Sequence, residues 1–155
     1  MSLSPLLMQR SNPYCWAIMP AMIEKITEFS EEHTASGTDA CAARFQCAFG
    51  AALPEMLCIA ILKDGEVGQL AGHVICGVET YLGKSACMVY QFSKESGTDE
   101  DWIATNKTIQ ALIDQWCQGL GLEEIMAMAE TKSRGRLFRQ FGYVEGPVLL
   151  RRRFQ

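Results

Sequence analysis

Apolar positions recur at helical spacing near the start of the chain and predict two helices. The first is expected to begin at Pro20, whose missing N–H costs nothing in a first helical turn, and to fray around His33. The second is expected over residues 39–49, with Thr38 as its N-cap. Residues 1–19 are expected to form an irregular lead-in. The apolar positions of the first helix are Met22, Ile23, Ile26 and Phe29.

The middle of the chain carries the pattern of β-strands instead. Residues 57–62 form a continuous apolar run that is short enough for a fully buried strand. Residues 69–81 and 85–92 are two further strand-like stretches, and turn signals that contain glycine separate the three. Because short turns join consecutive strands, the three are expected to form an antiparallel meander.

Helical and strand patterns alternate after the meander. A broad apolar face predicts a long helix over residues 99–118, followed by a short strand at 125–129 and a short helix at 133–141. Residues 143–154 are expected to finish the sheet. A strand–helix–strand crossover requires its two strands to be parallel neighbours. The expected fold is therefore α/β, of the α+β type: a mixed central sheet in which an antiparallel meander precedes a parallel crossover, with helices on both faces.

Composition narrows the classes of function. A chain of 155 residues with 48% apolar residues is expected to form one globular domain, 1–155. The net charge of −4 argues against nucleic-acid binding, and no stretch approaches the ~18 apolar residues of a membrane span. With no signal-peptide pattern, a cytoplasmic protein is expected. Seven cysteines, an odd number without a C-x-x-C motif, indicate buried thiols in a reducing compartment rather than a disulfide framework or a metal site.

Two short motifs carry a resemblance to a known family. Residues 119–125 read Gly-Leu-Gly-Leu-Glu-Glu-Ile, similar to the family's helix-to-strand link. Residues 137–143 read Leu-Phe-Arg-Gln-Phe-Gly-Tyr, similar to its aliphatic-Tyr-x-x-aliphatic-Gly-Phe ending. With the order of the elements and Gly72 in the middle strand, the chain resembles the GNAT acyltransferase superfamily from about Pro20 to Phe154. Resemblance in fold does not by itself establish chemistry.

The resemblance implies an enzyme that moves an acyl group from acetyl-CoA to an amine of a small molecule or peptide, in a chain that pairs as a homodimer. The pantetheine arm would lie between the strands at 87–92 and 125–129, with strand backbone holding the acyl carbonyl. The pyrophosphate would rest at the start of the long helix, where unpaired N–H groups and the helix dipole favour an anion. The cofactor-binding residues implied here are Gln91, Phe92, Ser93, Gly97 and Thr98, together with Phe138 of the last helix.

Basic residues flank the last helix of the chain. In the family fold this side faces the CoA nucleotide, so Lys132, Arg134 and Arg136 are candidates for phosphate contacts. The alternative is an ordinary solvated face.

The catalytic candidates are weaker than the fold resemblance. Glu130 follows the second cleft strand and could deprotonate an amine through water, or be a solvated loop carboxylate. His73 could act in acid–base chemistry or be a buried structural histidine; Glu55 and Glu79 are lesser candidates for the base. Phe138 stands where many family members carry a tyrosine that protonates the leaving thiolate, and loss of such an acid costs ~10²–10⁴-fold in rate.

The loop before the long helix departs from the family pattern of Arg or Gln, two residues, Gly, one residue, Gly or Ala. Residues 93–102 contain a single glycine that could serve such a loop, Gly97. Thr98 and Asp101, three residues apart, predict a capping-box-like start of the helix. Carboxylates at 99–101 each stabilise a first helical turn by ~0.3–1 kcal/mol, and they occupy the end that a diphosphate needs. Two hypotheses therefore stay open: an acetyl-CoA-dependent transferase, and a GNAT-like domain without transferase activity that serves as a binding or assembly module.

Overall fold

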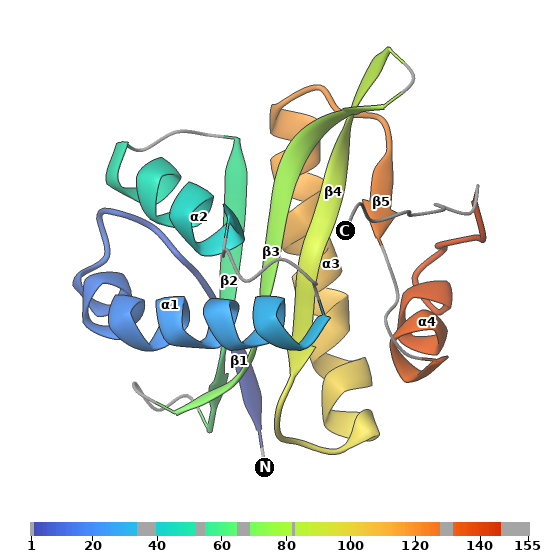
Figure 1. Ribbon diagram of the computed structural model, residues 1–155. Coiled ribbons are helices and arrows are strands. Elements are labelled where there is room, and N and C mark those ends of the chain that lie inside the picture. Colours follow the sequence, from blue (N-terminus) through green and yellow to red (C-terminus); the bar gives the residue numbers. More distant parts are fainter. Residues whose placement is uncertain are drawn as a thin grey trace, which may run out of the picture.

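A mixed five-stranded sheet with helices on both faces forms the framework of the protein (Figure 1). The computed structural model describes residues 2–33, 40–51, 55–64, 69–81, 83–127 and 132–146. The elements are β1 (Leu3–Leu7), α1 (Pro13–His33), α2 (Ala40–Ala51), β2 (Met56–Lys63), β3 (Leu70–Tyr81), β4 (Lys84–Lys94), α3 (Asp99–Gly119), β5 (Ile125–Ala127) and α4 (Lys132–Arg139).

The strands lie side by side in sequence order, β1-β2-β3-β4-β5. Pairs from β1 to β4 are antiparallel, and β4 pairs with β5 in parallel. The predicted meander and parallel crossover are therefore confirmed, and with them the mixed α+β fold.

Helices cover the two faces of the sheet in different ways. In Figure 1, α1 and α2 lie in front of the sheet, α3 lies behind it, and α4 lies beside the β4–β5 edge. The side chains of β2 alternate between two buried clusters, with Ile59 and Ile61 toward α3 and Cys58 and Ala60 toward α1 and α2. The run at 57–62 is continuously apolar because both faces of this strand are covered. Burying each large aliphatic side chain stabilises the fold by about 1.5–3 kcal/mol.

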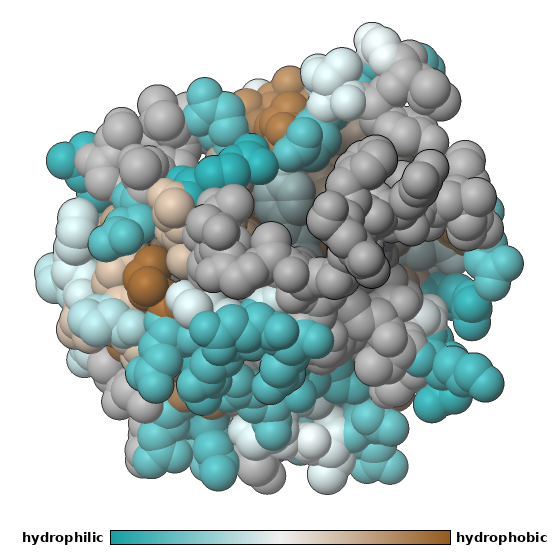
Figure 2. Space-filling model, viewed as in Figure 1, coloured by the Kyte–Doolittle hydropathy of each residue, from teal (hydrophilic) through white to brown (hydrophobic). Residues whose placement is uncertain are grey.

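The α1/α2 face is mostly hydrophilic where α1 meets solvent, as Figure 2 shows in the same view. No helix in the described ranges is long and apolar enough to cross a membrane. Five described cysteines are buried in the two clusters as free thiols, as the sequence predicts. They are Cys15, Cys58, Cys76, Cys87 and Cys117.

The prediction of an irregular lead-in at residues 1–19 is wrong. Residues Leu3–Leu7 form β1, which pairs with β2 from Leu3↔Lys63 to Leu7↔Ile59. The strand tolerates Pro5 because β1 lies at the edge of the sheet, where a missing N–H removes no ladder bond.

Helix α1 begins at Pro13, so the predicted start at Pro20 is also wrong. Cys15 and Ile18 are buried and extend the helical spacing that Met22 continues beyond the proline. A proline inside a helix costs about 3 kcal/mol. Burial of the apolar residues on both sides of Pro20 outweighs that cost.

The later elements follow the prediction closely, with one exception at the end of the chain. The long helix was expected over 99–118 and spans Asp99–Gly119, and the last helix was expected over 133–141 and spans Lys132–Arg139. Residues 143–146 are described and form no strand, so the predicted strand does not begin at Tyr143. The rest of that strand, the N-cap residue Thr38 and the end of the strand at 128–129 lie outside the described residues.

A β-bulge interrupts β4 at Tyr90. Ile75 of β3 pairs with Gln91 and Cys76 pairs with Val89, so Tyr90 is an extra residue between two registers. Because of this insertion, Tyr90 and Gln91 both contact the α1/α2 side, whereas Val89 and Phe92 belong to the cluster under α3. Bulges of this kind re-aim side chains and often lie beside functional sites.

Candidate functional site

In the part of the chain that the structure describes, the parallel pair of β4 and β5 spans three residues of each strand. Cys87, Met88 and Val89 pair with Ile125–Ala127, and β4 then continues through the bulge to Lys94. Among the described residues, this second half of β4 has a strand partner on the β3 side alone. The sequence predicts the acyl-CoA cleft beside this second half of β4.

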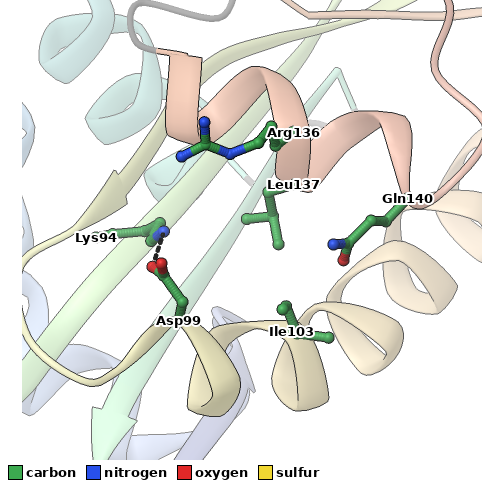
Figure 3. Close-up of a pocket in the computed structure, with 6 residues that line it drawn as sticks. All are labelled: Lys94, Asp99, Ile103, Arg136, Leu137 and Gln140. Atoms are coloured by element: carbon green, nitrogen blue, oxygen red, sulfur yellow. Dashed lines mark hydrogen bonds and ion pairs between the residues drawn. The ribbon is translucent and has the colours of Figure 1, made fainter.

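A pocket lies between the end of β4, the start of α3 and α4 (Figure 3). Figure 3 shows Leu137 pointing from α4 toward α3, where Ile103 lies. The residues that line the pocket are Lys94, Asp99, Ile103, Arg136, Leu137 and Gln140.

The charges of the pocket leave a small positive excess. The Lys94 Nζ atom lies 3.4 Å from Asp99 Oδ1, so these two charges largely offset each other. The Arg136 guanidinium makes no ion pair with the described part of the chain. Arg136, one of the basic residues predicted to meet CoA phosphates, is thus brought to the start of α3. The side chain of Arg134 is outside the described residues.

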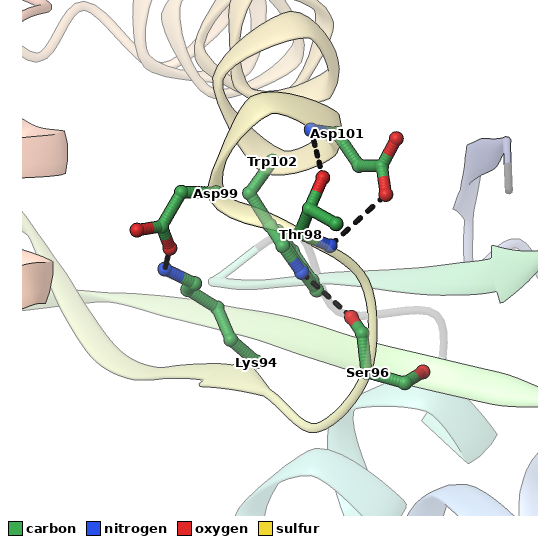
Figure 4. A network of polar contacts seen from close by, with 6 residues as sticks. All are labelled: Lys94, Ser96, Thr98, Asp99, Asp101 and Trp102. Carbon is green, nitrogen blue, oxygen red and sulfur yellow. Dashed lines mark hydrogen bonds and ion pairs between the residues drawn. The ribbon is translucent and has the colours of Figure 1, made fainter.

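The predicted capping box at the start of α3 is confirmed (Figure 4). The Thr98 hydroxyl accepts from the Asp101 amide at 3.2 Å, and Asp101 Oδ2 accepts from the Thr98 amide at 3.0 Å. The backbone N–H of Thr98 lowers the pKa of the Asp101 carboxyl, because hydrogen bonding favours its charged form. Two donors that a diphosphate could use are therefore already satisfied.

The loop before α3 is held against β3 by its own backbone. The Glu95 and Ser96 amides both donate to the carbonyl of Ala71, at 2.8 and 3.2 Å. The indole N–H of Trp102 donates to the carbonyl of Ser96 at 2.7 Å. Gly72 permits this close approach, because a Cβ there would lie 2.0 Å from the Ser93 oxygen.

Some backbone donors at the start of α3 remain for a ligand. The amides of Gly97, Asp99 and Glu100 make no hydrogen bond to the described residues. Gly97 has a φ of 97°, in the left-handed region that favours glycine. These donors lie among the first-turn carboxylates, so an anion here meets both attraction and repulsion.

Gln91, Phe92 and Ser93 have buried side chains, so any ligand would contact their backbone. Gln91 Nε2 donates to Ser30 Oγ at 2.9 Å and to the carbonyl of Ile26 at 3.3 Å, which ties β4 to α1. Their role in cofactor binding, predicted through the backbone, stays a prediction.

His73 lies on the α1/α2 face of the sheet, whereas the pocket lies on the α3/α4 side. Its side chain is 1% exposed, and Nε2 lies 2.7 Å from Gln91 Oε1. The ring also packs edge-on against Phe29 at 5.9 Å. These contacts are those of a structural histidine, and the catalytic role stays a prediction. Glu130 lies outside the described residues.

Phe138 belongs to the core beneath the pocket and is 4% exposed. Its ring packs between Phe92 at 5.5 Å and Tyr143 at 5.0 Å. The Tyr143 hydroxyl donates to Gln110 Oε1 at 2.9 Å, and burial raises the pKa of this phenol. Tyr143 is thus a hydrogen-bonded structural group rather than a ready proton donor at the pocket.

The sequence analysis missed one polar cluster, which joins Arg44 of α2, Glu79 of β3 and Tyr90 of β4. Glu79 appeared there only as a lesser candidate for a base. Its partners are 35 and 11 residues away, so only the three-dimensional fold brings the three together. The aromatic side chain of Tyr90 within the strand was the one local signal.

The fold is that of the GNAT acetyltransferases. The chain is similar to glucosamine-6-phosphate N-acetyltransferase from Arabidopsis thaliana, with a TM-score of 0.66, 12% identity and coverage of 100% of both chains. It is similar to an aminoglycoside acetyltransferase from an uncultured soil metagenomic sample, with a TM-score of 0.67, 16% identity and coverage of 100% of both chains. A predicted acetyltransferase with acetyl-CoA from Clostridium acetobutylicum superposes with a TM-score of 0.67 and 10% identity, over 97% of this chain and 96% of that one.

No protein-family model matches the sequence, and no curated protein matches it significantly. At these identities the structural likeness establishes the fold and leaves the chemistry to the residues of this chain.

Proposed function

We propose that this protein transfers an acetyl group from acetyl-CoA to an amine of a small molecule or peptide. One observation carries the proposal: within the described residues, β4 pairs with β5 only from Cys87 to Val89, and its far end reaches a pocket with a basic excess. The edge of β4 beyond Val89 would offer its backbone to an extended pantetheine arm, as an added strand requires. Solved structures of the same fold include one with acetyl-CoA, which supports the same ligand here.

The groups in and beside the pocket fit the charged end of CoA. Arg136 and Lys94 supply positive charge, and the amides of Gly97, Asp99 and Glu100 supply N–H donors at a helix N-terminus. Arg134 is a further candidate for the same contact. Asp99 weakens the site because its carboxylate already holds Lys94.

Acetyl-CoA supplies an activated thioester carbonyl to the reaction. The backbone of residues 91–93 orients that carbonyl, and Glu130 accepts the proton of the attacking amine through water. Phe138 has no proton to give, so the leaving thiolate takes its proton from solvent. Because a general acid is typically worth ~10²–10⁴-fold in rate, we expect slow turnover.

A second function is favoured by the start of α3. The capping box satisfies backbone N–H donors at the helix end that CoA would use. The first-turn carboxylates of Asp99, Glu100 and Asp101 offset the positive charge of that end. A GNAT-like domain without transferase activity, serving as a binding or assembly module, would have no need of that end. The homodimer and the cytoplasmic location also stay proposals, and sedimentation at several protein concentrations tests the first.

Thermal unfolding with and without millimolar acetyl-CoA separates the two functions. Ligand that binds the native state at about 100 times its Kd adds about 2.7 kcal/mol to stability, so a transferase shows a clear rise in Tm. Thiol release against a panel of primary amines then measures transfer. No rise in Tm together with no thiol release would leave only the non-enzymatic function.

Arg136→Ala and Arg139→Ala form a matched pair for locating the bound cofactor. Both arginines lie on α4, but Arg136 lines the pocket, whereas Arg139 pairs with Glu145 at 2.9 Å on the surface. We expect Arg136→Ala to reduce the Tm rise with acetyl-CoA and Arg139→Ala to leave it unchanged. An equal effect of the two substitutions would place the cofactor elsewhere.

A further inference from the structure

The cluster of Arg44, Glu79 and Tyr90 lies on the α1/α2 side of the sheet. The Arg44 guanidinium donates to Glu79 Oε1 at 3.1 Å and to the Tyr90 hydroxyl at 3.0 Å. The Tyr90 hydroxyl in turn donates to the same Glu79 oxygen. Three side chains from three different elements are thus joined by a closed set of polar contacts.

The cluster is held in place by the backbone around it. A Cβ on Gly77 would lie 2.3 Å from Cε2 of Tyr90, so the glycine makes room for the ring. The Arg44 guanidinium lies over that ring, 5.2 Å from its centroid, in a cation–π contact. The bulge at Tyr90 sends this side chain to the α1/α2 face together with that of Gln91. The Glu79 carboxylate is therefore fixed in advance rather than mobile.

One oxygen of Glu79 remains available. Both donors reach Oε1, and Oε2 makes no hydrogen bond or ion pair to the described residues. The side chain is 41% exposed, so a solute can reach it. Hydrogen bonds from Tyr90 and Arg44 lower the pKa of Glu79, while burial and Glu79 raise the pKa of Tyr90 to about 12. At neutral pH the carboxylate is ionised and the phenol keeps its proton.

The cluster lies on the other side of the sheet from the basic pocket and further back along β4. Lys94 marks the pocket end of the strand, and Tyr90 lies four residues earlier, about 13 Å along an extended backbone. A donor whose phosphates lie at Lys94 and whose arm follows β4 would carry its acyl end to the bulge. A second reactant can then approach from the α1/α2 face, where Glu79 lies.

From this arrangement we infer that Glu79 binds the ammonium group of the acceptor, with Tyr90 holding the carboxylate in position and Arg44 partly neutralising it. The inference rests on the proposed transferase function and narrows its acceptor to compounds that carry a cationic amine. An anionic acceptor is disfavoured, because Arg44 is already neutralised by Glu79 and stacked on Tyr90.

A direct binding measurement tests the inference without relying on transfer. The probe is n-butylammonium, with n-butanol as its neutral counterpart, titrated into the full chain and followed by amide chemical shifts. We expect n-butylammonium, but not n-butanol, to shift the amide resonances around Glu79 and Tyr90. Glu79→Gln should weaken binding about fivefold, as loss of an exposed ion pair does, and Glu24→Gln, at an exposed glutamate of α1 outside the cluster, should leave it unchanged.

Arg44→Gln guards against a result that reflects misfolding. Removing the competing cation should tighten n-butylammonium binding about threefold, a gain that a damaged fold cannot produce. No shifts in the native protein, or equal binding by Glu79→Gln, would overturn the inference. Ammonium binding at Glu79 with no Tm rise in acetyl-CoA would instead overturn the transferase function and leave an ammonium site.

Discussion

The two sides of β4 around its bulge use polar groups in opposite ways. On the α3/α4 side, the Thr98 and Asp101 side chains and the Glu95 and Ser96 amides are engaged in holding the loop and the helix start. On the α1/α2 side, the contacts of the Arg44–Glu79–Tyr90 cluster converge on one Glu79 oxygen, and the other oxygen bonds to none of the described residues. On the α3/α4 side, where the predicted cofactor cleft lies, fewer polar groups are therefore available to a ligand. The α1/α2 side carries no sequence motif, yet it holds a carboxylate oxygen that is ready to bind one.

The largest expected effect is the loss of stability caused by Gly72→Ala, which disturbs the loop on the α3/α4 side. The new Cβ would lie 2.0 Å from the Ser93 oxygen and 2.6 Å from the Trp102 ring, so backbone must shift. We expect a loss of about 1–3 kcal/mol in unfolding free energy, measured by urea denaturation. Gly119→Ala is the control, because a Cβ there meets nothing within 4 Å. Equal stability of the two variants would show that the loop is not held as tightly as described.

Gly77→Ala attacks the α1/α2 side by displacing the Tyr90 ring. Because a ring can rotate more cheaply than backbone can move, we expect a smaller loss, about 1 kcal/mol. Binding of n-butylammonium should fall with it, while the Tm rise in acetyl-CoA should persist. If acetyl-CoA binding is lost and ammonium binding is kept, the two sides have been assigned in the wrong order.

Asp99→Asn should raise the affinity of the α3/α4 side for acetyl-CoA. The substitution removes a carboxylate that repels phosphate and releases Lys94 from its ion pair. Acidic groups in a first helical turn interact with the helix dipole by about 0.3–1 kcal/mol, so we expect acetyl-CoA to bind two- to fivefold more tightly, on the order of that energy. Calorimetric titration measures this, with Asp114→Asn at an exposed position of the same helix as the control. Unchanged affinity would show that the phosphates lie away from Asp99.

The smallest expected effect is a pH dependence of stability that arises at Glu79. The folded pKa of Glu79 is lowered, chiefly by the hydrogen bond from Tyr90. Its ionised form therefore stabilises the fold above the unfolded pKa, and this contribution disappears as the pH falls through the lowered folded value. The fall in Tm between about pH 7 and about pH 3 should be slightly smaller in Glu79→Gln than in the native protein. A fall of the same size in both would show that Glu79 gains nothing from its partners.

Local signals explain what the sequence could predict. Thr98 and Asp101 are three residues apart, so the capping box could be inferred and the start of α3 placed at Asp99. The continuous apolar run of β2 implied coverage on both faces, and the structure shows it. Where one local rule opposed a tertiary effect, the inference failed: Pro20 was taken as a helix start, although burial of Cys15 and Ile18 extends α1 well before it.

The candidate site was harder to predict because it depends on register. Whether Tyr90 faces α2 or α3 is decided by one inserted residue, and no local pattern in 84–94 fixes the place of a bulge. The contact of Arg44 with Tyr90 spans 46 residues and exists only once α2 has docked. The same limit applies to His73, whose neighbour Gln91 is 18 residues away.

Tyr90, the inserted residue of the bulge, is not required for the pairing of β3 with β4. Deleting Tyr90 would join Val89 directly to Gln91, opposite the consecutive residues Cys76 and Ile75, and would restore an unbroken ladder. The hairpin would thus remain geometrically complete one residue shorter. The β3–β4 ladder therefore does not need Tyr90 in order to form. A variant with Tyr90 deleted would separate loss of chemistry from loss of folding.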